Sequence, residues 1–252
     1  MGVIICTIII IHQPSRQPAL VIGANRDEFY ARPSTPPQQI DSFYAGIDKK
    51  AGGSWMGATK DGFIVGITNQ RTKEPPSTSR LSRGQLVIDA LQLAETQKVK
   101  KYLQQQNNYN GFNLLFGKAG DLYIAYGHRP GDKPQIEPVP FGIHVLPNGK
   151  RNDKQFFKVS QALRKSKEIA ELPWEQQRQL LQQVLMNEQV APRPDPVPGW
   201  LQGWGYTLSS VFVKSPKYGT CSSTIIATNN NKLLEYWFAD HLRDGQFVRL
   251  NR

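Results

Sequence analysis

Two groups of residues near the start of the chain could do chemistry together: the thiol of Cys6 and the polar row Asn25-Arg26-Asp27-Glu28. A nucleophile at the beginning of a chain can use its own α-amino group, with a pKa of about 8, as general base. Such a site needs a polar cluster on a neighbouring strand to orient the amine. The alternative is an inert core cysteine, which is the usual role of cysteine in an apolar strand.

The polar row follows the apolar run 18–22, which predicts a buried strand ending at Ala24. Four consecutive hydrogen-bonding residues do not fit the alternation of a half-buried strand, and burying them is costly without a full set of partners. We expect Arg26 and Asp27 to form the polar floor of a pocket beside Cys6, with Glu28 or Asn25 fixing the loop. The alternative is a structural network in which Arg26 pairs with Glu28 or with a remote carboxylate.

The elements that must position these residues are mainly hairpins. Apolar runs flank Gly or Asn turns in segments 54–69, 112–127 and 223–238, and segment 5–24 predicts a further hairpin with a Pro-containing loop. Helical periodicity covers 82–105, 153–170 and 174–188, while the proline-rich segment 190–199 predicts a loop. The pattern indicates one α+β domain over residues 1–252. In it, two mainly antiparallel sheets face each other between outer helices, and the Cys6 strand is central.

Composition and the absence of known motifs restrict the classes of function that the chain could have. The 252 residues carry a formal net charge of +11, which favours an anionic partner or, alternatively, only a well-solvated surface. The sequence has no zinc-ligand spacing, glycine-rich phosphate loop, nucleophile-elbow serine or nucleic-acid-binding motif. Cys6 and Cys221 are too few and too far apart for a disulfide framework. The apolar run 3–11 is too short to span a bilayer and lacks signal-peptide features, which indicates a cytoplasmic protein.

A set of short motifs gives a more specific indication. In their order along the chain they are Cys6-Thr7, ANRDEFYARP (24–33), GGSWMG (52–57), TN (68–69), RG (83–84), NGFNLL (110–115), Asn148 and YGTCSST (218–224). With these motifs the chain resembles the NRDE family, also called TANGO2 (transport and Golgi organisation 2), over almost its whole length. That family is similar to N-terminal-nucleophile hydrolases of the choloylglycine hydrolase and penicillin acylase kind, which implies an αββα sandwich.

The resemblance also implies catalytic roles. Cys6 would attack an amide carbonyl, Asp27 would hold the amine, and Asn69 and Asn148 would donate to the oxyanion. The alternative for both asparagines is a turn position. Two departures argue against catalysis: Met1–Ile5 precede Cys6, whereas family members usually start Met-Cys, and Cys221 stands where the family motif usually has Arg.

The family is linked to haem mobilisation, lipid or acyl-CoA handling and secretory-pathway organisation. We therefore expect a protein that requires no cofactor and binds or carries an amphipathic anionic ligand, haem first or acyl-CoA. The alternative is a cysteine amidohydrolase that cleaves linear amides with Cys6. The expected ligand-binding residues are Asn25, Arg26, Glu28, Trp55 and Arg71. Further aromatic candidates for a cleft are Phe29, Tyr30 and Trp204. None of the histidines, His12, His128, His144 and His241, has the context of an iron ligand.

Overall fold

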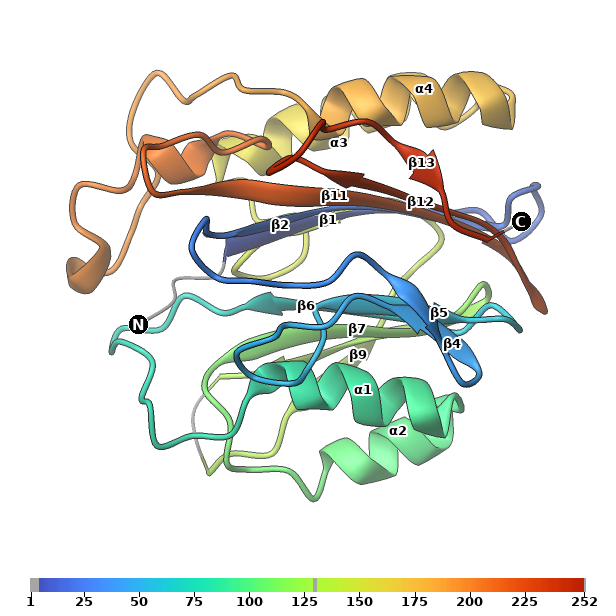
Figure 1. Cartoon of the computed structure of the whole chain (residues 1–252), viewed down its shortest axis with the longest axis horizontal. Coiled ribbons are helices and arrows are strands. Elements are labelled where there is room, and N and C mark those ends of the chain that lie inside the picture. Colours follow the sequence, from blue (N-terminus) through green and yellow to red (C-terminus); the bar gives the residue numbers. More distant parts are fainter. Residues whose placement is uncertain (1–4, 129–130, 252) are drawn as a thin grey trace.

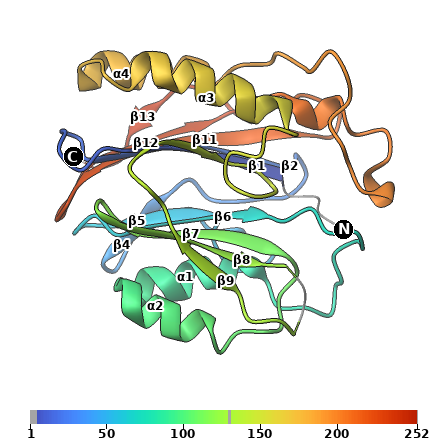
Figure 2. The ribbon, with the colours of Figure 1, turned by 180° about the vertical axis from the view of Figure 1, so that it is seen from behind.

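The structure, a computed structural model, describes residues 5–128 and 131–251. Two antiparallel sheets lie face to face, with α3 and α4 outside one sheet and α1 and α2 outside the other (Figures 1 and 2). This is the expected αββα sandwich, and the prediction is confirmed. Within the described ranges, no helix has the length and apolar character needed to cross a bilayer.

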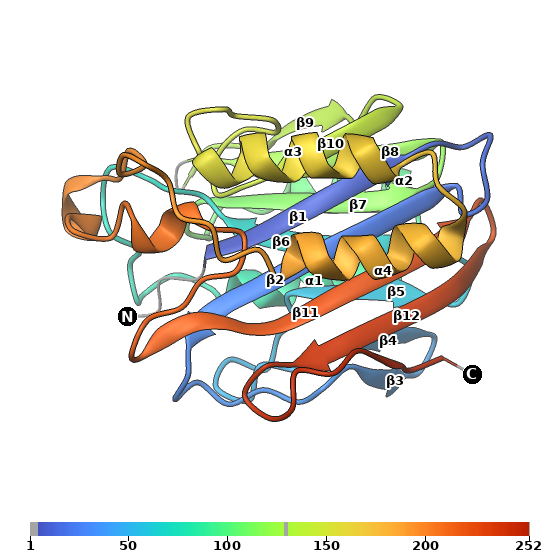
Figure 3. The same ribbon diagram turned by 90° about the horizontal axis from the view of Figure 1, so that it is seen from above.

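The six-stranded sheet contains the strand of Cys6. Its order is β10 (Gly142–Leu146), β1 (Ile5–His12), β2 (Leu20–Phe29), β11 (Tyr218–Asn229), β12 (Lys232–Asp240) and β13 (Val248–Arg249). Because β1 pairs with β10 on one side and β2 on the other, it is an interior strand, as its apolar run predicted. Figure 3 shows α3 and α4 lying across this sheet.

The seven-stranded sheet follows the order of the chain. Its strands are β3 (Gln38–Ile40), β4 (Phe43–Ala45), β5 (Met56–Thr59), β6 (Ile64–Asn69), β7 (Phe112–Lys118), β8 (Asp121–Gly127) and β9 (Gln135–Pro138). The β5–β6, β7–β8 and β11–β12 hairpins agree with the predicted turns. The short strands β3, β4, β9, β10 and β13 were not predicted, because two to five residues carry too little periodicity to detect.

The helices are α1 (Arg83–Leu93), α2 (Thr96–Leu103), α3 (Phe157–Ile169) and α4 (Trp174–Leu185). A single helix over 82–105 was the wrong prediction. Ala94 adopts a left-handed conformation with φ 46° and ends α1, and α2 then begins in a new direction. The segment 190–199 is a loop, as predicted, and it leads into a 3-10 turn at Gly199–Leu201. A second 3-10 turn, Thr207–Ser209, follows it.

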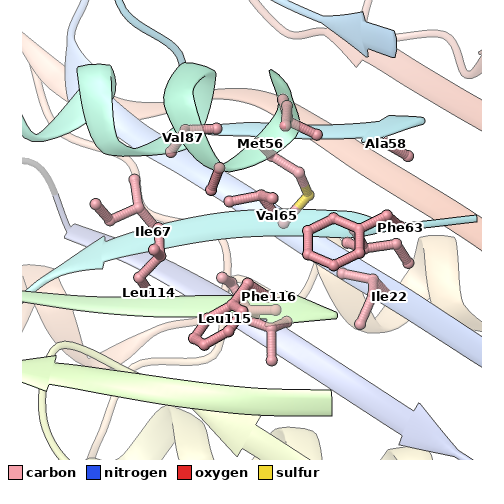
Figure 4. Close-up of a cluster of buried hydrophobic side chains, with 14 of the residues drawn as sticks. Ile22, Met56, Ala58, Phe63, Val65, Ile67, Val87, Leu114, Leu115 and Phe116 are labelled. Atoms are coloured by element: carbon pink, nitrogen blue, oxygen red, sulfur yellow. The ribbon is translucent and has the colours of Figure 1, made fainter. Parts of the chain in front are cut away.

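Side-chain alternation along β1 divides the core. Ile8 and Ile10 belong to the hydrophobic cluster between the sheets, whereas Ile9 and Ile11 belong to the cluster under α3 and α4. The first cluster also continues through the seven-stranded sheet to Val87 of α1, and Figure 4 shows part of it. The same alternation places the side chain of Cys6 on the face of β1 that looks toward the second sheet.

The strand β2 is longer than predicted. It does not end at Ala24 but continues to Phe29, so that the whole polar row lies inside a strand paired on both sides. Alternation then sends Arg26 and Glu28 toward the second sheet, and Asn25 and Asp27 toward the layer of α3 and α4. The polar row therefore serves two different environments.

Candidate functional site

Cys6 lies directly opposite Arg26 across the β1–β2 ladder, and Ile5 lies opposite Asp27. The thiol is buried, with 3% of the residue exposed. Burial, and after it the charge of Asp27, raise the pKa of Cys6 to about 12, although a backbone hydrogen bond from Asp27 and the charges of Arg26 and Lys158 lower it. At neutral pH the thiol is therefore protonated unless a neighbouring group takes up its proton.

Asp27 is fully buried, and only one of its two carboxylate oxygens has a hydrogen bond within the described residues. Thr220 donates to Oδ1 at 2.6 Å, and Oδ2 has no partner there. Burial raises the pKa of Asp27 to about 7, although Lys158, Thr220 and Arg26 all lower it. The carboxyl group therefore titrates near neutral pH.

Lys158 is a buried cation that affects the pKa of Asp27, and the sequence motifs did not indicate it. It lies on the buried face of α3 with Val159 and Ala162 and has no exposed surface. Its Nζ has no hydrogen-bond partner in the part of the chain that the structure describes. Burial lowers the pKa of Lys158 to about 8, and the charges of Asp27 and Cys6 oppose this shift. A lysine in the apolar stripe of an amphipathic helix was the available signal in the sequence.

Asn25 has a structural role. Its Nδ2 donates to the backbone oxygens of Leu185 and Val211, each at 2.8 Å, and Ser223 donates to its Oδ1 at 2.6 Å. The Asn25 side chain thus ties β2 to the end of α4. Asn25 was expected to bind a ligand, but its side chain faces the helices and not the space between the sheets.

Arg26 lines a cavity of about 340 Å³, named here the Arg26 pocket. Five cationic side chains and one carboxylate line it: Arg26, Arg32, Lys50, Arg80, Arg83 and Asp48. Trp55, Ile67 and Leu81 give the pocket an apolar part. This combination suits a ligand with both an anionic and an apolar portion.

The ion pairs of the pocket leave Arg26 only loosely held. Its Nη2 lies 3.5 Å from Asp48 Oδ2, and its guanidinium lies over the Trp55 ring at 4.7 Å. Asp48 is held more closely by Arg32 Nε, at 2.6 Å, and Arg32 also pairs with Glu28 at 3.5 Å. The remote carboxylate, and not Glu28, is therefore the partner of Arg26.

Two glycines fix the position of α1 at this pocket. A Cβ on Gly53 would lie 2.4 Å from the carbonyl carbon of Gly84, so that only glycine allows this approach. Ser54 N donates to Gly84 O at 3.0 Å, which joins the start of β5 to the first turn of α1. The motifs GGSWMG and RG thus meet at one place, and the N-terminus of α1 borders the pocket.

The structure brings the two predicted oxyanion donors together. Asn69 lines the Arg26 pocket, and Asn148 Nδ2 donates to the Asn69 backbone oxygen at 2.7 Å. Arg71 lies elsewhere. Its Nη1 donates to Pro196 O at 3.0 Å, and its guanidinium lies 4.6 Å from the Phe156 ring centroid. Burial lowers the pKa of Arg71 to about 10.

Arg71 lines a second cavity of about 730 Å³, named here the Arg71 pocket. The two cavities share Ser77, Arg80 and Asn110. They therefore adjoin along the loop that connects β6 to α1.

Cys221 occupies a β-bulge. Thr220 pairs with Asp27 and Ser222 pairs with Arg26, so that Cys221 is the extra residue between them. Its thiol lies 3.5 Å from the Glu28 backbone oxygen, to which it donates. Bulges often occur beside active sites, because they redirect side chains. Here the bulge lies opposite the centre of the polar row.

The remaining aromatic candidates, and the four histidines, are not among the residues that line the Arg26 pocket. Phe29 and Trp204 both pack edge-on against Tyr218, and Tyr30 follows β2. His12 and His144 both contact Pro140 O, and His241 contacts Ser223. His128 lines the Arg71 pocket. No group of three or more His, Cys, Asp or Glu residues in the described ranges could hold a metal ion.

Comparison with known proteins agrees with this architecture. Among solved structures, a Caenorhabditis elegans N-acylethanolamine-hydrolyzing acid amidase ortholog superposes with a TM-score of 0.56 at 11% identity, covering 88% of this chain and 92% of the other. Conjugated bile acid hydrolase from Clostridium perfringens gives a TM-score of 0.60 at 10% identity, covering 98% of this chain and 92% of the other. At these identities the similarity establishes a shared N-terminal-nucleophile hydrolase-like fold.

Sequence similarity to named relatives identifies the family to which the chain belongs. The human Transport and Golgi organization protein 2 homolog is 31% identical over 234 residues, covering 82% of this chain and 81% of the relative. The Drosophila melanogaster Transport and Golgi organization protein 2 is 25% identical, covering 90% and 89%. The model of the family described as Transport and Golgi organisation 2 matches residues 4–240. The chain belongs to this family, TANGO2.

Proposed function

We propose that this chain binds and carries an amphipathic anionic small molecule in the cytoplasm, with haem as the first ligand to test and an acyl-CoA or another lipid as the second. The supporting observation is the Arg26 pocket, in which five cationic side chains face one carboxylate beside Trp55 and Ile67. Cations gathered in a concave site attract anions and bind carboxylates or phosphates through charge-assisted hydrogen bonds.

The N-terminus of α1 adds to this preference. Ser82, Arg83 and Gly84 line the pocket, and the Ser82 side chain makes no capping hydrogen bond. The first backbone N–H groups of a helix and its dipole favour an anion at that position. Arg83 Nη1 donates to the Gly111 backbone oxygen at 3.0 Å, which holds this guanidinium at the wall of the pocket.

The pocket suits a cargo held by its anionic groups. No His, Cys, Met or Tyr is among its described lining residues, so haem would bind there through its carboxylates, without a protein ligand to iron. The apolar body would lie along Trp55, Ile67 and Leu81. A ligand held in this way can exchange, which a carrier requires.

Titration of haem and of a long-chain acyl-CoA tests the proposal. We expect Arg26→Ala to weaken binding by about 1 kcal/mol, or about fivefold, because a charge-assisted hydrogen bond is lost. Cys6→Ala should leave the affinity unchanged, because Cys6 is not among the residues that line the pocket. Arg243→Ala is the matched control, since the Arg243 side chain is 74% exposed on the surface. Absence of saturable binding by both ligands, or equal affinities for the two arginine variants, would refute the proposal.

A second proposal is cysteine amidohydrolase activity, favoured by the position of Cys6 on an interior strand one register step from Asp27. The two solved structures of the same fold are described as an acid amidase ortholog and a conjugated bile acid hydrolase. In this reaction Cys6 would attack the carbonyl, Asp27 would orient the base, and Asn69 and Asn148 would donate to the oxyanion. Cleavage of an acyl amide that disappears in Cys6→Ala would replace the carrier by the hydrolase.

A further inference from the structure

The Arg26 pocket holds more positive charge than its own carboxylates balance. Five cationic side chains line it, and Asp48 is the single carboxylate among its described lining residues. A second carboxylate, Glu28, lies 3.5 Å from Arg32, so that Arg32 is placed between two acidic groups. Three lining cations have no ion pair within residues 5–128 and 131–251: Lys50, Arg80 and Arg83.

Asp48 has no capacity left for these cations, because its carboxylate is already fully used. Its Oδ1 accepts hydrogen bonds from the backbone N–H groups of Lys50 and Ala51, at 3.0 and 3.1 Å. Its Oδ2 accepts from Arg32 Nε at 2.6 Å and from Arg26 Nη2 at 3.5 Å. A carboxylate offers about four lone-pair positions, so these four donors occupy all of them.

Two guanidinium groups of the pocket retain most of their donors. The Arg26 side chain is 2% exposed, and its 3.5 Å contact with Asp48 is the only hydrogen bond that it makes within the described residues. Arg83 donates from Nη1 to Gly111 O at 3.0 Å, and its other side-chain nitrogens have no partner in the same ranges. A buried donor without an acceptor is costly, and an anion in the pocket would satisfy both groups.

The start of α1 adds donors at the same place. The backbone N–H groups of Arg83 and Gly84 have no acceptor in the part of the chain that the structure describes, and both residues line the pocket. The hydroxyl-bearing residues Ser77, Thr78 and Ser82 line it as well. These donors outnumber what the two oxygens of one carboxylate can accept. A phosphate ester has three terminal oxygens and a charge of about −1.5 to −2 at pH 7.

We propose that the Arg26 pocket binds a phosphate dianion, the head group of an amphipathic phosphate ester, in preference to a single carboxylate. This preference rests on the proposed function, in which the pocket holds the anionic part of the ligand. A dianion balances two of the charges that the pocket leaves unpaired, whereas a carboxylate balances one. Arginine also matches phosphate geometrically, because its planar fork donates two parallel hydrogen bonds to the phosphate oxygens.

Calorimetric titration with three ligands of one tail length tests the head group in the full chain. Octyl phosphate, octyl sulfate and octanoate are compared at pH 7.5, below the concentrations at which they form micelles. Octyl phosphate should bind about tenfold more tightly than octanoate, because it brings a further charge and a further oxygen. Octyl sulfate combines the shape of the phosphate with the single charge of the carboxylate, so its affinity should lie closer to that of octanoate.

Lys50→Gln and Lys49→Gln form a matched pair of variants. Both lysines are exposed and adjacent, but only Lys50 is among the residues that line the pocket. Lys50→Gln should weaken octyl phosphate about threefold and octanoate less, because it removes one of the unpaired charges. Lys49→Gln should leave both affinities unchanged. Equal weakening in the two variants would show that general surface charge attracts the ligands, which overturns the phosphate site.

The outcomes separate the phosphate preference from the proposed function. Equal affinities for octyl phosphate and octanoate, or for octyl phosphate and octyl sulfate, overturn the preference, as does the absence of octyl phosphate binding. Binding of haem or acyl-CoA that depends on Arg26 would still support the carrier. Inorganic phosphate distinguishes the two sources of the head group. An affinity equal to that of octyl phosphate would assign the site to free phosphate and overturn the ester, whereas much weaker binding supports the ester.

Discussion

His241 couples the polar row to the stability of the fold. Its Nε2 lies 2.8 Å from Ser223 Oγ, and the Ser223 hydroxyl donates to Asn25 Oδ1 at 2.6 Å. Because the single hydroxyl proton goes to Asn25, the neutral His241 ring must donate from Nε2 to Ser223. Burial lowers the pKa of His241 from 6.5 to about 4, although Asp240 opposes the shift.

The direction in which pH changes the stability follows from the difference between the pKa of His241 in the folded and in the unfolded chain. The unfolded chain takes up a proton at His241 near pH 6.5, whereas the folded chain does so only near pH 4. The stabilisation is therefore complete above pH 6.5, is lost as the pH falls toward 4, and does not change further below that. Between pH 7.5 and pH 5 the two values give a loss of about 2 kcal/mol, which partial solvent exposure of the ring reduces to about 1 kcal/mol.

Urea unfolding of wild type and His241→Gln at pH 7.5 and pH 5 measures this contribution. Glutamine can still donate to Ser223 but does not titrate, so the variant should lose about 1 kcal/mol less than wild type between the two pH values. His12 and His144 also have lowered pKa values, but both remain in the variant and cancel in the comparison. Equal losses in the two proteins would refute the reasoning about His241.

Three further substitutions test the packing around the site, each by chemical or thermal unfolding. Gly53→Ala should destabilise by about 2 kcal/mol or more, because its Cβ would meet the backbone of Gly84, and a neutral result would contradict that contact. Ala94→Gly should stabilise by up to about 1 kcal/mol by removing the left-handed strain at φ 46°, and any destabilisation would argue against that conformation. Thr220→Val should cost about 1–3 kcal/mol, since Asp27 Oδ1 loses its donor and Val213 N loses its acceptor, and unchanged stability would show that these two bonds contribute nothing.

Much of the fold could be predicted from local sequence. The β5–β6, β7–β8 and β11–β12 hairpins carry their turn residues, and the apolar run of β1 correctly indicated an interior strand. The end of β2 was misplaced, because a polar row normally ends a strand. Its continuation to Phe29 depends on partners from distant segments, namely Thr220, Asp48 and Leu185.

The sequence alone determined which groups are present: a thiol in an apolar strand, the polar row 25–28, the motif glycines and a net charge of +11. Only the tertiary structure decided how these groups are arranged in space. It sent Arg26 and Asp27 to opposite faces of one strand and set five cations around the Arg26 pocket. It also buried Lys158, which lies on α3, far along the chain from Cys6. Alternation along a strand can be read locally, but burial and proton affinity depend on segments that meet only when the chain folds.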